Sequence, residues 1–123
     1  NRENLLNINK LEKGGLSGKP LEKRSNELIN KFYKILENKI KIIGVGGVDS
    51  GQSAYQKIIN GATLVQLYTG MIYQGPSIAS KISEELINIL DKERVKNISD
   101  VVGSKNWSWL ATLEHLYNHK FYV

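Results

Sequence analysis

The sequence predicts an α/β fold built on a parallel sheet. Two short apolar runs, Ile42–Val45 and Thr63–Leu67, each end in a turn of small or polar residues, and a segment with helical periodicity lies between them. Nearly continuous apolar strands joined by a crossover helix are typical of a βαβ unit in a parallel sheet buried on both faces. Because two parallel strands cannot cover their own apolar faces, we expect this unit to belong to a larger α/β sheet or barrel.

The composition fits one globular domain and argues against several other kinds of protein. The chain has 123 residues, 41% of them apolar, and contains no cysteine, so neither a disulfide framework nor a cysteine metal site is expected. The net charge is +5 and the basic residues are spread along the chain, which argues against a nucleic-acid partner. No apolar run approaches the roughly 20 residues of a membrane-spanning helix.

The N-terminal third predicts a loop, a glycine-rich turn and a helix. Residues 1–13 are polar and without periodicity, and the segment Gly14–Pro20 contains three glycines before its proline. Such a segment approaches a ligand closely or serves only as a connecting turn, and local composition leaves both open. Residues 21–37 have helical periodicity. The apolar face of this helix carries Leu21, Leu28, Phe32, Ile35 and Leu36.

The middle of the chain predicts the crossover helix and one further helix. The crossover helix should begin with Asp49 or Ser50 as its N-cap and end at the pair Asn60-Gly61. A short turn follows the second strand and places Pro76 at the first position of a helix that runs to about Lys92.

Beyond Val95 the pattern weakens. Residues 98–103 are compatible with a last helical turn, and residues 104–123 form an aromatic-rich tail in which apolar side chains again share a helical face. His115 and His119 are one helical turn apart, but a metalloprotease pattern needs Glu where Leu116 stands. We therefore predict no metal site.

The turns after the two strands form the candidate binding site. The run from Gly44 to Gly47 suggests a dinucleotide-binding fingerprint, but Asp49 stands where that fingerprint needs Gly or Ala, and the acidic residue that would bind a ribose is missing. A (β/α)8 TIM barrel fits better, because its phosphate site commonly lies between the loops after strands seven and eight, beside a short extra helix. The fold predicted is thus the C-terminal portion of a TIM barrel, about strands seven and eight with flanking helices.

In that barrel the Gly46-Gly47 turn would end one strand and the run from Tyr68 to Gly70 would end the next, with residues 69–73 as the short helix. Backbone amides and the helix dipole would then bind a dianion without a lysine. The alternative, that both turns are only tight connections, stays open.

Three separated segments resemble the quinone-dependent, membrane-associated class of dihydroorotate dehydrogenase in its C-terminal part. They are GGLSGKPL at 14–21, IIGVGGVDSG at 42–51 and GATLVQLYTGMIYQG at 61–75, and the resemblance extends from about Arg2 to Gly103. It implies a TIM barrel that holds FMN, which accepts a hydride from dihydroorotate, giving orotate, and passes electrons to a quinone. The cofactor-binding residues implied are Gly18 in the glycine loop, Gly47, Tyr68 and Thr69 at the phosphate, and Gly46 and Gly70 in the same turns.

The resemblance also implies what this chain lacks. The family's catalytic serine, its substrate-binding asparagines, its flavin-contacting lysines and its quinone-tunnel helices belong to sequence before Asn1. We therefore expect no catalytic residue here and no activity from these 123 residues alone. The whole protein is expected at the mitochondrial inner membrane or the bacterial cytoplasmic membrane, with residues 1–103 in the barrel and 104–123 as a divergent tail.

Two alternatives remain beside this interpretation. One is another FMN or phosphate-binding barrel enzyme, although such a barrel has no need of the GGLSGKPL loop. The other is a non-catalytic remnant or binding module that keeps a flavin or phosphate site.

Overall fold

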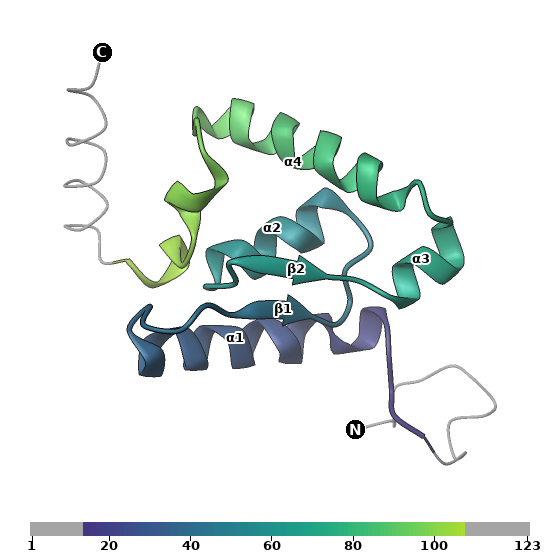
Figure 1. The fold of residues 1–123 in the computed structure, drawn as a ribbon, viewed down its shortest axis with the longest axis horizontal. Coiled ribbons are helices and arrows are strands. Elements are labelled where there is room, and N and C mark those ends of the chain that lie inside the picture. Colours follow the sequence, from purple (N-terminus) through teal and green to yellow (C-terminus); the bar gives the residue numbers. More distant parts are fainter. Residues whose placement is uncertain (1–13, 108–123) are drawn as a thin grey trace.

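The computed structural model describes residues 14–107 and contains the predicted βαβ unit (Figure 1). Strands β1 (Ile43–Val45) and β2 (Leu64–Gln66) are parallel and pair in the register Ile43 to Leu64, Gly44 to Val65 and Val45 to Gln66. Helix α2 (Gly51–Ile59) connects them. The α/β prediction is confirmed, and the carboxyl ends of both strands lie at the same edge of the sheet.

The chain reaches β1 through the 3₁₀-helix η1 (Lys19–Leu21) and helix α1 (Glu22–Leu36). The helix predicted at residues 21–37 is therefore confirmed to within a residue at each end. Its apolar face is only partly covered, because Ile29 is buried while Leu28, Phe32 and Ile35 are 45%, 54% and 72% exposed. The helix was predicted correctly, but Ile29, the residue that it buries, was not part of the predicted face, and three residues of that face are exposed in the described chain.

Of the two candidate N-caps for α2, the structure uses Ser50. Its side chain accepts a hydrogen bond from the Ser53 backbone N–H, and the Ser53 hydroxyl accepts one from the Ser50 N–H, which completes a capping box. The helix ends at Asn60, as predicted, and Gly61 follows with a φ of 122°. A side chain at Gly61 would collide with the ring of Tyr33, so this glycine allows α1 and α2 to approach each other.

Helices α3 (Thr69–Gln74) and α4 (Ile78–Glu93) follow β2. The predicted short helix is confirmed, but α4 begins two residues after Pro76 rather than at it. The chain first closes a turn in which the Ile78 N–H bonds the Gly75 carbonyl, and Ser77 is the N-cap. The last turns are the 3₁₀-helices η2 (Ile98–Val101) and η3 (Ser104–Asn106), and the predictions for residues 108–123 lie outside the described residues.

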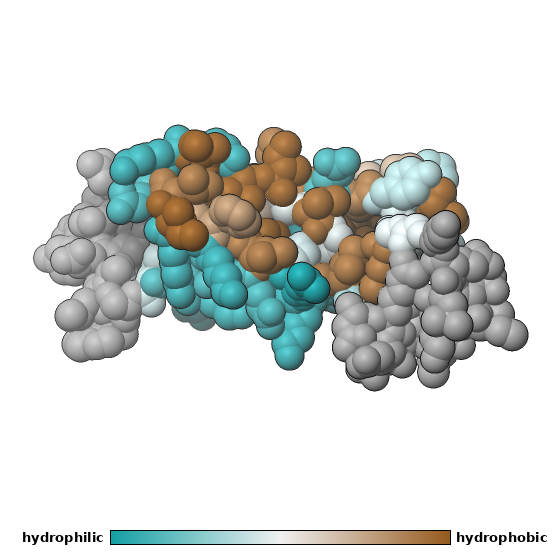
Figure 2. Space-filling view, turned by 90° about the horizontal axis from the view of Figure 1, so that it is seen from below, coloured by the Kyte–Doolittle hydropathy of each residue, from teal (hydrophilic) through white to brown (hydrophobic). Residues whose placement is uncertain are grey.

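The buried core lies on one side of the sheet, between α2 and α4. One cluster consists of Val48, Ala54, Ile78 and Ile82, and a second joins Tyr55, Ile58 and Val101. The expectation that both faces of the strands are buried is wrong for the described chain, since Ile43, Val45 and Leu64 are all more than half exposed. Seen from below the ribbon, apolar side chains gather between hydrophilic ones (Figure 2).

The asymmetry follows from where the described helices lie. A Cβ on Gly44 would meet both Ile29 of α1 and Lys57 of α2, so these two helices lie on the same side of β1, whereas Ile43 and Val45 point to the opposite side and are exposed. Within residues 14–107 no helix combines the length and the apolar character needed to cross a membrane.

Candidate functional site

The candidate site lies where the two strands end. After Val45 the chain turns through Gly46 and Gly47, whose φ angles of 100° and 76° favour glycine. After β2 the chain passes through Tyr68, which is 74% exposed, into α3. Because the strands are parallel and in register, both turns lie at one edge of the sheet, as predicted.

The glycine-rich loop reaches the same edge, although about 50 residues separate it from α3. The Ser17 hydroxyl lies 2.5 Å from the Thr69 hydroxyl. A Cβ on Gly18 would lie 3.0 Å from the Thr69 methyl carbon, so only a glycine allows this approach without adjustment. The structure thus brings Gly18 and Thr69 together.

Gly47 and Gly70 are tightly packed against neighbouring backbone. A Cβ on Gly47 would lie 2.6 Å from the Cβ of Glu22 in the first turn of α1, and one on Gly70 would lie 2.6 Å from the Val48 carbonyl oxygen. Gly46 has more room, since its Cβ would be 3.4 Å from that of Leu21. These glycines let α1, the β1–α2 turn and α3 converge.

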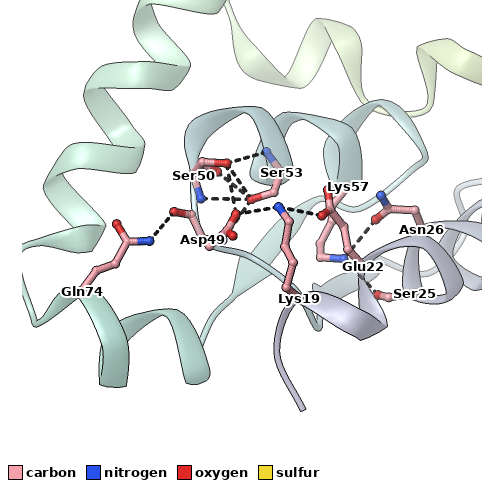
Figure 3. Close-up of polar contacts among 9 residues, drawn as sticks. All are labelled: Lys19, Glu22, Ser25, Asn26, Asp49, Ser50, Ser53, Lys57 and Gln74. Atoms are coloured by element: carbon pink, nitrogen blue, oxygen red, sulfur yellow. Dashed lines mark hydrogen bonds and ion pairs between the residues drawn. The ribbon is translucent and has the colours of Figure 1, made fainter. Parts of the chain in front are cut away.

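An ion-pair network joins the glycine loop to the turn after β1 (Figure 3). The Lys19 ammonium lies 2.9 Å from a Glu22 carboxylate oxygen and 3.0 Å from one of Asp49. The hydrogen bond to Glu22 raises the pKa of Lys19; partial burial opposes this, and Asp49 adds to it. Burial raises the pKa of Asp49, but Lys19 and the hydroxyls of Ser53 and Ser50 outweigh burial and hold that pKa below its ordinary value.

The network also reaches α3, because the Gln74 side chain donates a hydrogen bond of 2.9 Å to the Asp49 backbone carbonyl. The loop, the β1–α2 turn and α3 are therefore joined pairwise: Lys19 with Asp49, Asp49 with Gln74, and Thr69 with Ser17.

The N-terminus of α2 is already occupied by acceptors from the protein. Ser50 caps it, and the Gly51 N–H donates a hydrogen bond of 2.5 Å to the carboxylate of Glu85 in α4. A dinucleotide-binding site would need these donors for a pyrophosphate. The arrangement therefore agrees with the rejection of that fingerprint at Asp49. The role of Glu85 was not predicted, since the sequence shows it only as a surface carboxylate.

A second unpredicted residue is Lys57, whose side chain is fully buried. Its ammonium donates hydrogen bonds of 3.0 Å to the Ser25 hydroxyl and 3.0 Å to the Asn26 side-chain oxygen. Burial lowers the pKa of Lys57, and the charge of Glu22 opposes that shift. The signal available in the sequence was a lysine among the apolar positions of the crossover helix.

Residues 14–107 contain no cluster of three or more His, Cys, Asp or Glu side chains that could hold a metal ion. His115 and His119 lie outside this range. The groups that the site presents are backbone amides of glycine turns, hydroxyls and paired charges, which suit an anionic ligand better than a cation.

Fold and site together define a segment of a parallel α/β protein that gathers its glycine turns where such proteins bind ligands, beyond the carboxyl ends of the strands. A family profile described as dihydroorotate dehydrogenase matches residues 2–90. The chain belongs to the dihydroorotate dehydrogenase family, which confirms the resemblance.

Curated relatives and solved structures agree with this assignment. The chain is 43% identical over 102 residues to dihydroorotate dehydrogenase (quinone) of Deinococcus radiodurans, covering 83% of this chain and 28% of the relative. It is 48% identical over 93 residues to the mitochondrial quinone enzyme of Arabidopsis thaliana, covering 76% and 20%. A ligand-free crystal structure of the Eimeria tenella enzyme matches with a TM-score of 0.83 at 39% identity, covering 86% of this chain and 29% of that one. The chain thus spans less than a third of the length of these relatives.

Proposed function

We propose that this chain is the C-terminal part of a quinone-dependent dihydroorotate dehydrogenase and that it supplies the site for the FMN phosphate. The observation that carries the proposal is the meeting of three distant segments at one edge: Gly18 against Thr69, and Gly70 against the turn after Gly47. When bound, FMN would take a hydride from dihydroorotate and pass electrons to a quinone. This chain would bind and orient the cofactor, with the catalytic and substrate-binding groups supplied by the rest of the protein.

The residues present fit a phosphate group. The turns at Gly46-Gly47 and at Tyr68-Thr69 would offer backbone amides, the first turn of a helix leaves its N–H groups without helical acceptors, and the Thr69 hydroxyl is an additional donor. Gly18 would let the glycine loop approach the flavin closely. Lys19 is already paired with two carboxylates, so the site would hold its anion through neutral donors.

The proposal includes a complete (β/α)8 barrel in which β1 and β2 are strands seven and eight. Its support is an apolar groove of about 510 Å³ between α1 and β1, lined among others by Leu28, Phe32, Ile43 and Val45. Exposed apolar surface of this kind is costly in water, and a neighbouring barrel strand would cover it. The whole protein would then act at a mitochondrial inner or bacterial cytoplasmic membrane, as the quinone substrate requires.

The test is the replacement Thr69→Val in the full-length protein, which removes the hydroxyl and keeps the shape. We expect FMN affinity to fall about three- to tenfold, the effect of one lost hydrogen bond, in a fluorescence titration of the apoprotein. Thr63→Val, at the opposite end of β2, is the control and should bind FMN like the parent. Equal affinity in both variants, or a parent that binds no FMN and does not oxidise dihydroorotate, would contradict the proposal.

A further inference from the structure

Burying the Lys57 ammonium costs free energy, and both groups that accept its hydrogen bonds lie on α1. Its side chain has no exposed surface, and its two hydrogen-bond acceptors, Ser25 and Asn26, are neighbours in the first turns of α1. An unpaired buried ammonium would cost several kcal/mol, whereas an apolar residue would fill the same space without that cost. The lysine therefore calls for a reason beyond packing.

The strand above Lys57 is shaped to let its side chain pass. A Cβ on Gly44, in the middle of β1, would lie 3.1 Å from the Lys57 Cδ and 2.9 Å from the Ala62 Cβ. The glycine leaves room for the lysine stem to run from α2, beside β1, to α1. Helix α2, strand β1 and helix α1 thus all meet at the Lys57 side chain.

Ser25 transmits this contact to the end of β1. Its hydroxyl donates a hydrogen bond to the carbonyl of Val45, the last residue of the strand. The same hydroxyl accepts the hydrogen bond from Lys57 (Figure 3). An ammonium group can only donate, so Ser25 must accept from it, and the single hydroxyl hydrogen is left for Val45. Asn26 accepts from the same ammonium but makes no hydrogen bond with β1.

We propose that Lys57 is a positioning residue: through Ser25 it fixes the carbonyl of Val45 and, with it, the Gly46-Gly47 turn that receives the phosphate. The inference rests on the proposed function for its ligand, but not for its geometry. Gly46 and Gly47 are two consecutive glycines with positive φ angles, so the turn has few side-chain restraints of its own. A fixed carbonyl immediately before it limits the orientation of the peptide groups that follow.

The test compares Ser25→Ala with Asn26→Ala in the full-length protein. Each variant removes one acceptor from Lys57 at adjacent positions of the same helix, but only Ser25→Ala removes the bond to Val45. We expect amide hydrogen exchange of the segment 44–50 in the apoprotein to accelerate about three- to tenfold in Ser25→Ala and to stay at the parental rate in Asn26→Ala. FMN dissociation should accelerate by a similar factor only in Ser25→Ala, with a shifted ³¹P resonance of the bound phosphate.

Lys57→Met connects the effect to the lysine. Lys57 and Ser25 act through one relay, the chain of hydrogen bonds from Lys57 through Ser25 to the Val45 carbonyl. The double variant Lys57→Met with Ser25→Ala should therefore release FMN no faster than the faster single variant. Additive effects, or equal exchange rates in the Ser25 and Asn26 variants, would overturn the inference. If Lys57→Met does not fold, the Ser25 and Asn26 pair still decides. A parent without FMN would refute the proposed function while the exchange rates still decide the relay, whereas unchanged rates with normal FMN binding would refute the relay alone.

Discussion

The α2–α4 half of the chain and the α1–β1 half have the same amphipathic pattern but differ in how far they are covered. In the first half Ala54 and Ile78 are 1% exposed, whereas in the second half Phe32 and Ile35 are 54% and 72% exposed. Periodicity in the sequence identifies the face of a helix that needs a partner. It does not tell whether the partner belongs to the same stretch of chain.

The candidate site lies on the boundary between these halves. Gly47 packs against Glu22 at the start of α1, and Gly70 packs against Val48 at the start of the α2 connection. The geometry of the candidate site therefore depends both on the covered α2–α4 half and on the exposed α1–β1 half. Changes on either side of the boundary separate the two contributions.

The largest effect is expected for Phe32→Ala in the full-length protein. If the groove between α1 and β1 is covered there, the free energy of unfolding should fall by about 3–5 kcal/mol, as for a buried aromatic residue. Ile78→Ala, in the covered half, should cost about 2–5 kcal/mol in the same denaturant titration. Lys34→Ala, an exposed position on α1, is the surface control and should change stability by less than about 0.5 kcal/mol. A Phe32 variant as stable as the Lys34 variant would show that the groove stays open.

A smaller effect should separate the two glycines of the turn at this boundary. Both have positive φ angles, so an alanine costs about 1–2 kcal/mol at either position. At Gly47 the new Cβ would also lie 2.6 Å from that of Glu22, whereas at Gly46 its nearest neighbour is 3.4 Å away. Gly47→Ala should therefore destabilise the apoprotein by about 1–3 kcal/mol more than Gly46→Ala, as overpacking does.

The same denaturation curves decide the origin of the difference. Measured without FMN, they report packing against α1 rather than cofactor binding. Equal losses at the two glycines would mean that α1 retreats at no cost, and the close approach would then not help to fix the turn.

The local pattern predicted the elements well because the signals were local. Helix periodicity, the Ser50 cap and the glycine turns each depend on a few neighbouring residues, and each is found in the structure at or near its predicted position. The exception is the start of α4, where Pro76 lies in the preceding turn. A proline fits the first helical turn and a reverse turn equally well, and its fixed φ does not distinguish them.

The site was only partly predictable. The glycine turns could be found because their residue types and the order of the strands indicate one edge of a parallel sheet. The contact of Gly18 with Thr69 and the buried path of Lys57 depend on distances between segments far apart in sequence, and no local pattern contains those distances. The residues of the turns by themselves indicate only an anionic ligand, and FMN is what the resemblance to the family implies.

The smallest effect is expected for the ion pair between Lys19 and Asp49, which ties the glycine loop to the covered half. Both side chains are substantially exposed, so their coupling should be about 0.2–1 kcal/mol in a double-mutant cycle of Lys19→Met and Asp49→Asn, and weaker at high salt. The pKa of Asp49 is lowered in the folded state, so its contribution is present above about pH 4 and is lost as the pH falls through the folded value. The pKa of Lys19 is raised, so its contribution is present below the ordinary lysine value and is lost as the pH rises through the folded one.

Denaturant unfolding of the full-length protein in low salt, at pH 7 and at pH 2–3, measures the contribution of Asp49 to the free energy of unfolding. The parent should lose more stability on acidification than Asp49→Asn, because the variant has no carboxylate to protonate at that position. Glu22 also faces Lys19 and keeps part of the lysine's stabilisation in the Asp49 variant, which is why the difference is small. An identical acid loss in parent and variant would mean that Asp49 does not hold the loop. Its position would then depend on Glu22, the Ser17–Thr69 contact and the packing of Gly18, and not on the turn after β1.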